Sequence, residues 1–97
     1  MENIGHKVII RGSDSGVEFG ELIEQNGQEI TLKNARRLWY WEGAASLSQL
    51  AVNGTQAPDK CKFTITVPSI TILDTIEIIP CTDEAIKSIE SVPEWKL

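Results

Sequence analysis

Short segments that alternate between apolar and polar residues, each closed by turn residues, fill the first half of the chain and constrain its fold most. Residues 7–11 are predicted to form a strand, and a second strand over 17–24 falls out of alternation at Gly20, as at a bulge or a sharp bend. Asn26-Gly27 is typical of a tight hairpin, and a third strand over 29–33 follows it. The chain therefore begins as a series of short, bent strands.

A corner at Asn34-Ala35 is expected to separate the third strand from a fourth over residues 36–42. A short central helix follows, from about Ala44 or Ser46 to Val52. Its predicted C-terminal stop is Asn53-Gly54, because glycine and asparagine tolerate the backbone that ends a helix.

The remaining residues are predicted to form further strands and a last helix. Residues 62–67 alternate, and Pro68 is expected to end this strand. The β-branched stretch 69–80 is either one long bent strand or two short ones. Thr82 is predicted to cap a C-terminal helix that stops at Val92-Pro93. The side chains expected to face the core from these elements are Phe63, Ile65, Val67, Ile86 and Ile89, with Trp95 packed back as a lid.

These elements predict a single α+β domain over residues 1–97, a small bent antiparallel β-barrel or sheet with a short central helix and a C-terminal helix. The pattern Gly16-Val17-x-Phe19-Gly20-x-Leu22, followed by Gly27, Leu32 and Asn34-Ala35, is similar to the strand pattern of Sm-like and SH3-like barrels. This similarity implies a fold rather than a function. A domain of 97 residues buries a modest core, so a homo-oligomer is expected.

The charge and the hydropathy of the chain indicate which partners it can have. A net charge of −5 argues against a protein that mainly grips a phosphate backbone, so nucleic acid is not an expected partner. Basic residues nevertheless gather in the middle of the chain, which suits a small anion. No apolar run approaches the ~20 residues that span a bilayer, and the first residues do not form a signal peptide. We therefore expect a cytoplasmic protein without a membrane partner.

Catalysis is not expected. The one histidine, His6, is predicted to be exposed and uninvolved, so neither a metal cluster nor a histidine-dependent nucleophile is indicated. Cys61 and Cys81 are predicted to be free thiols. The acidic residues of the second strand, Glu18, Glu21 and Glu24, are predicted to lie on its solvated side. No glycine-rich phosphate loop is present, and no cofactor is predicted.

The segment 34–46 contains two of the three tryptophans and the only tyrosine, and it runs into the start of the central helix. Alternation along a strand places Arg37, Trp39 and Trp41 on one face and Arg36, Leu38, Tyr40 and Glu42 on the other. Aromatic rings stack on bases, and arginine binds phosphate. Backbone N–H groups at a helix start also bind anions. The candidate ligand-binding residues are Arg36, Arg37, Trp39, Trp41, Gly43, Ala44, Ala45 and Ser46.

The alternative interpretation of this segment is structural. A Leu-Trp-Tyr-Trp strand often forms a core and a subunit interface, with its arginines paired to acidic residues of the C-terminal quarter. The sequence leaves open whether Trp39 and Trp41 face a ligand or another subunit.

The block 34–51, Asn-Ala-Arg-Arg-Leu-Trp-Tyr-Trp-Glu-Gly-Ala-Ala-Ser-Leu-Ser-Gln-Leu-Ala, resembles a family of small phage- and prophage-encoded proteins of unknown function. Segments 58–63, 77–82 and 88–95 carry the same resemblance. The resemblance implies a phage origin and no catalytic residues.

The hypothesis that combines these observations is a phage anti-defence protein that sequesters a nucleotide-derived immune signal, of the cyclic oligonucleotide or cyclic ADP-ribose type, without catalysis. The alternatives are an Sm-like nucleic-acid-binding module and a virion or assembly interaction module.

Overall fold

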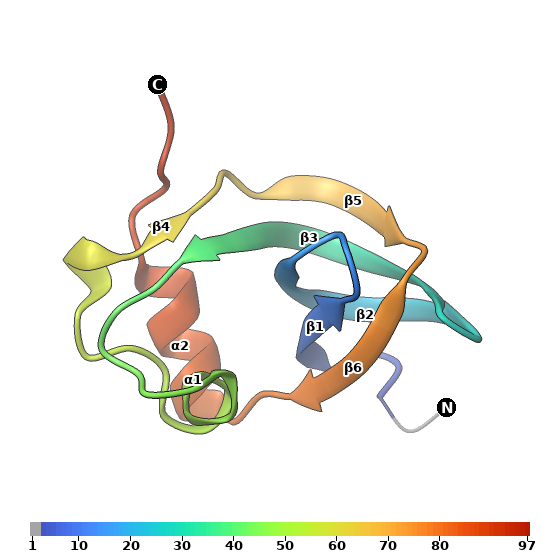
Figure 1. Ribbon diagram of the computed structural model, residues 1–97, viewed down its shortest axis with the longest axis horizontal. Coiled ribbons are helices and arrows are strands. Elements are labelled where there is room, and N and C mark those ends of the chain that lie inside the picture. The colour runs from blue at the N-terminus through green and yellow to red at the C-terminus, as the bar shows by residue number, and fades with distance from the viewer. Residues whose placement is uncertain (1–2) are drawn as a thin grey trace.

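The computed structural model describes residues 3–97 and places six strands in one strongly bent antiparallel sheet, with two helices together at one end (Figure 1). The elements are β1 (Lys7–Gly12), β2 (Val17–Asn26), β3 (Glu29–Tyr40), α1 (Leu47–Asn53), a 3-10 turn η1 (Pro58–Lys60), β4 (Lys62–Phe63), β5 (Val67–Ile72), β6 (Thr75–Pro80) and α2 (Asp83–Ser91). The predicted fold class is confirmed.

The strand order explains the bend. The hairpins β1–β2 and β2–β3 form the middle of the sheet, β5 pairs with β3 on one side, and β6 pairs with β1 on the other. Because β5 and β6 are joined through residues 73–74, the two outer edges of the sheet meet at one turn. The sheet is bent and not closed. The stretch 69–80 is thus two strands, one of the two predicted alternatives.

Backbone irregularities produce the curvature at the predicted positions. The register between β2 and β3 shifts between Phe19 and Glu21, around Gly20. A Cβ atom on Gly20 would lie 3.1 Å from the Ala35 Cα atom, so glycine permits the close approach of the strands. Asn34 has a φ of 52°, a left-handed conformation that asparagine tolerates. The predicted corner is real, but it lies inside one continuous strand, β3, and does not separate two strands.

Two groups of buried side chains stabilise the fold. One lies between the sheet and the helices and includes Ile9, Phe19, Leu38, Leu50, Phe63 and Ile89. The other lies inside the curve of the sheet and includes Val8, Ile10, Leu22, Ile30, Leu32, Ala35 and Ile72. The strands thus bury side chains on both faces near the bend.

The helices begin and end as the sequence predicts. The Ser46 hydroxyl accepts a hydrogen bond from the backbone N–H of Gln49 at the start of α1, and Gly54 ends this helix. The Thr82 hydroxyl caps α2 in the same way, and Val92 follows its last turn. Ile89 is buried and Ile86 packs against the same core, as predicted.

Three predictions in the region 62–68 are wrong. The predicted strand over 62–67 is only two residues long, and Val67 already belongs to β5. Pro68 lies inside β5, where it is tolerated because β5 pairs on one side only, with β3. Ile65 lies between the two strands and is 47% exposed, so its predicted inward orientation is also wrong.

Among residues 3–97, the helices are too short or too polar to cross a bilayer.

Candidate functional site

Arg36 is a structural residue. It is 5% exposed, and its guanidinium group donates to four backbone carbonyl oxygens. The acceptors lie at the C-terminal end of α2 and on the segment that contains β4: Ile89, Val92, Phe63 and Thr64. Burial lowers the pKa of Arg36 from its ordinary value, and the nearby acidic Glu94 and Glu90 oppose this change. A cation at the end of a helix satisfies carbonyl groups that have no partner in the helix itself. Arg36 therefore joins the C-terminal helix to the sheet.

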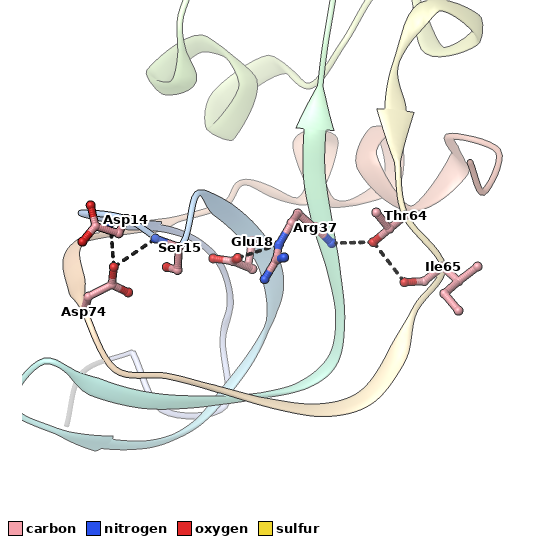
Figure 2. Close-up of polar contacts among 7 residues, drawn as sticks. All are labelled: Asp14, Ser15, Glu18, Arg37, Thr64, Ile65 and Asp74. Carbon is pink, nitrogen blue, oxygen red and sulfur yellow. Dashed lines mark hydrogen bonds and ion pairs between the residues drawn. The ribbon is translucent and has the colours of Figure 1, made fainter. Parts of the chain in front are cut away.

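Arg37 faces the other way and is half-exposed. Its Nε atom donates to Glu18 Oε2 at 2.9 Å, and its backbone N–H donates to the Thr64 hydroxyl at 2.9 Å (Figure 2). Among residues 3–97, its terminal Nη1 and Nη2 atoms have no hydrogen-bond partner. Arg37 thus offers two donor groups to a ligand while its Nε atom is anchored.

Glu18 is the partner of Arg37 and is only 1% exposed, so the prediction that it lies on the solvated side of β2 is wrong. Burial raises the pKa of Glu18, and the Arg37 guanidinium partly offsets this increase. Its second oxygen, Oε1, is buried and has no hydrogen-bond partner among the described residues. Sequence reasoning missed Glu18 because its partner is set by the β2–β3 register, in which residue 18 lies opposite residue 37.

A first cavity, of about 420 Å³, brings together the three residues predicted to share a face. Arg37, Trp39 and Trp41 line it from β3 and the segment that follows, and residues 14–17 line it from the β1–β2 loop and the start of β2. We call it the tryptophan cavity. Asp14 also lines the cavity and adds a carboxylate to it, so the cavity contains partners both for an anion and for hydroxyl or amino donors.

The two indoles differ in their surroundings. Trp39 is 63% exposed and stacks on Trp95, with ring centroids 6.2 Å apart and planes within 6° of parallel. Trp95 therefore covers another tryptophan rather than the core, which differs from the predicted lid. Trp41 is half-buried and packs against the core. The ring of Trp39 is the more accessible of the two.

A second cavity, of about 290 Å³, lies on the other side of Arg37. Its polar lining residues are Glu18, Arg36, Arg37 and Thr64, and its apolar ones are Ala35, Ile65, Val67 and Ile70. We call it the Glu18 cavity. Arg37 is the residue that the lining of this cavity shares with the lining of the tryptophan cavity.

The loop that borders the tryptophan cavity is held by Asp74, in the turn between β5 and β6. Asp74 Oδ2 accepts from the backbone N–H groups of Asp14 at 2.7 Å and Ser15 at 3.0 Å (Figure 2). It also accepts from the Ser13 hydroxyl at 3.2 Å. The bond from Asp14 is the largest cause that lowers the pKa of Asp74 to about 2. The position of one cavity wall therefore depends on this carboxylate.

The four residues before and at the start of α1 that were predicted to bind a ligand do not line either cavity. They are Gly43, Ala44, Ala45 and Ser46. The Ala45 N–H donates to the Gln49 side chain, Ser46 caps α1, and Ala44 packs against the core. Gly43 has a φ of 82° and lies against the loop 55–57, where a Cβ atom would be 2.5 Å from a backbone nitrogen. The structure therefore separates these four residues from Arg37, Trp39 and Trp41.

Other reactive side chains are placed apart. Among residues 3–97, no three His, Cys, Asp or Glu side chains are close enough together to hold a metal ion. Cys61 and Cys81 are free, as predicted, and burial raises the pKa of Cys81 to about 12. His6 is exposed.

Comparisons with known proteins give one family and one similar fold. A family model described as a domain of unknown function (DUF6948) matches residues 5–89. The crystal structure of a heptameric archaeal Sm protein is similar to this chain, with a TM-score of 0.53 and 14% identity over 84% of this chain and 93% of that one. At this identity the similarity concerns the fold alone, and it agrees with the Sm-like character predicted from the glycine pattern. None of the curated proteins compared with the chain matches it.

Proposed function

The chain belongs to the family described as a domain of unknown function (DUF6948), and we propose that it binds a nucleotide-derived anion in the tryptophan cavity without catalysis. One observation supports this most: Arg37, Trp39 and Trp41 line the same cavity, and the Arg37 terminal nitrogens have no partner among the described residues. An exposed indole can stack on a base, and a guanidinium fork binds phosphate through two parallel hydrogen bonds. The Asp14 carboxylate can accept hydrogen bonds from ribose hydroxyls.

We propose further that the bound molecule is an immune signal of the cyclic oligonucleotide or cyclic ADP-ribose type, and that a phage protein sequesters it. The support for this role is the resemblance of the block 34–51 to phage and prophage proteins, together with a binding surface made of an arginine and two indoles. Sequestration needs affinity and abundance but no chemistry, which suits such a surface.

Isothermal titration calorimetry against cyclic dinucleotides, cyclic trinucleotides and cyclic ADP-ribose isomers tests this function. We expect one class to bind, and Trp39→Ala to weaken its binding by roughly 5- to 100-fold, because stacking contributes ~1–3 kcal/mol per base. Tyr40→Ala is the matched control, since Tyr40 is the next residue, is exposed and does not line the cavity. Absence of heat with every ligand, from folded protein, would refute the proposal.

A second candidate function is favoured by the fold. The similarity to an archaeal Sm protein supports an Sm-like module that binds single-stranded nucleic acid, and the net charge of −5 counts against it. Filter binding of single-stranded RNA and DNA at low salt separates the two candidates. Retention that falls steeply with added salt would favour this second function over a small-molecule ligand.

We propose in addition that the chain forms a homo-oligomer. β5 and β6 each pair with only one neighbouring strand, so each has an open edge that a second copy can extend. The Sm protein of similar fold is described as heptameric, which supports an assembly of this kind.

A further inference from the structure

The Glu18 cavity contains an unusual feature, a buried carboxylate oxygen without a partner. Glu18 is 1% exposed, and Oε2 is occupied by Arg37, while Oε1 has no hydrogen-bond partner within residues 3–97. A buried, unpaired acceptor is costly, and such groups in folded proteins usually have a functional or structural explanation. Glu18 lines the cavity and Oε1 is itself fully buried, so a donor group in the cavity reaches this oxygen once the carboxyl group turns toward it.

Apart from Arg37, whose terminal nitrogens have no partner within residues 3–97, the other polar side chains that line this cavity are already engaged. The Thr64 hydroxyl accepts from the Arg37 backbone N–H and donates to the Ile65 carbonyl oxygen at 3.2 Å. The Arg36 guanidinium group donates to four backbone carbonyl oxygens. The remaining walls are apolar, and so the cavity offers a ligand one acceptor in surroundings that suit a flat, apolar ring.

The charge of the cavity indicates what kind of donor it accepts. The Arg37 guanidinium, 2.9 Å from Glu18, balances the carboxylate charge. An ammonium ion would therefore meet a pair without net charge, which gives it little attraction to offset the loss of its own hydration. A neutral N–H donor on an aromatic ring avoids this cost and still satisfies Oε1.

We propose that the Glu18 cavity binds the edge of a purine base that carries an exocyclic amino group, with the amino N–H donating to Glu18 Oε1. This inference rests on the proposed function, because the phosphate of the same ligand binds the terminal nitrogens of Arg37. Arg37 lines both cavities, so a ligand whose phosphate sits at Arg37 can place a base in the Glu18 cavity and a second ring in the tryptophan cavity.

Matched nucleotides that differ by one amino group test this inference. The probes are adenosine 5′-monophosphate against purine riboside 5′-monophosphate, and guanosine 5′-monophosphate against inosine 5′-monophosphate. We expect the amino-bearing member of at least one pair to bind about 10- to 100-fold more tightly, because an unpaired buried acceptor costs ~1–3 kcal/mol.

Glu18→Gln provides the second test. The glutamine carbonyl oxygen can accept from Arg37 Nε, which turns the amide NH₂ group, a donor, toward the cavity. We expect the preference for the amino-bearing nucleotide to fall to within about twofold. Glu24→Gln removes a carboxylate from the same strand at an exposed position outside the cavities, and it should keep the wild-type preference.

NMR shows which cavity the base enters. It therefore distinguishes a failure of this inference from a failure of the proposed function. We expect the probes to shift the methyl signals of Val67 and Ile70, which line the Glu18 cavity. Equal binding within each pair, with shifts at the Trp39 and Trp41 indoles alone, would overturn this inference and leave the proposed function standing. Absence of binding by all four nucleotides and by the cyclic signals would overturn both. The wild-type pairs decide the question even if Glu18→Gln does not fold.

Discussion

At the scale of single residues, two consecutive arginines have opposite roles. Arg36 is buried and donates to carbonyl oxygens of α2 and of the β4 segment, whereas Arg37 is half-exposed and lines both cavities. The pleat of β3 causes this difference, because neighbouring side chains on a strand point to opposite faces. Residue type alone thus does not identify the arginine that is free to bind a ligand.

We predict that Arg36→Met destabilises the protein by more than about 2 kcal/mol, because it leaves several buried carbonyl oxygens without a donor. The free energy of unfolding from urea denaturation measures the effect. Arg11→Met is the matched control, since Arg11 pairs with Glu77 at the surface and such pairs contribute ~0–1 kcal/mol. Equal losses for the two variants would show that the Arg36 contacts do not stabilise the fold.

At the scale of elements, the turn between β5 and β6 positions the β1–β2 loop. Asp74 accepts three hydrogen bonds from residues 13–15, and part of this loop forms one wall of the tryptophan cavity. The same turn also joins the two outer strands of the sheet. The Asp74 carboxylate therefore links the turn that joins β5 and β6 to the position of one wall of the tryptophan cavity.

The lowered pKa of Asp74 predicts a pH dependence of stability. Its folded-state pKa, about 2, lies below the ordinary value of 3.8, so its contribution is complete above that ordinary value and is lost as the pH falls through about 2. We expect Asp74→Asn to be less stable than the wild type at pH 7, with the difference vanishing near pH 2. Thermal unfolding of both proteins between pH 2 and pH 7 measures this. A difference that stays constant down to pH 2 would contradict the assignment.

At the scale of the whole molecule, the sheet has two open edges and several exposed apolar side chains. β5 and β6 are each unpaired on one side, and Ile23, Ile65, Leu73 and Ile76 are among the exposed large apolar residues. Open edges of this kind are templates for pairing with another chain. They support the proposed homo-oligomer, in which pairing between copies would cover them.

Native mass spectrometry tests the oligomer. We expect a single assembly larger than the monomer. Ser69→Pro and Ile70→Pro form a mapping pair: both residues lie in β5, and because neighbouring N–H groups on a strand point to opposite edges, one substitution removes an N–H group on the side of β3 and the other removes one at the open edge. A loss of assembly by a variant that stays folded would locate the interface at β5, whereas a monomeric wild type would refute the proposal.

The sequence by itself determined the local features of this protein. Asn26-Gly27, the caps at Ser46 and Thr82, and the irregularities at Gly20 and Asn34 are all encoded by neighbouring residues, and the structure confirms them. The shared face of Arg37 and Trp39 also follows from the period of a strand. These predictions succeeded because short-range steric and hydrogen-bonding preferences decide them.

Only the tertiary structure decided which side chains are free to bind a ligand and which are buried or already hydrogen-bonded. The burial of Glu18 opposite Arg37 depends on the register between β2 and β3, and the engagement of Arg36 depends on α2, more than fifty residues away in the sequence. The packing of Gly43 against residues 55–57 likewise joins segments that are more than ten residues apart. Contacts between distant segments set these outcomes, and the pattern of neighbouring residues does not contain them.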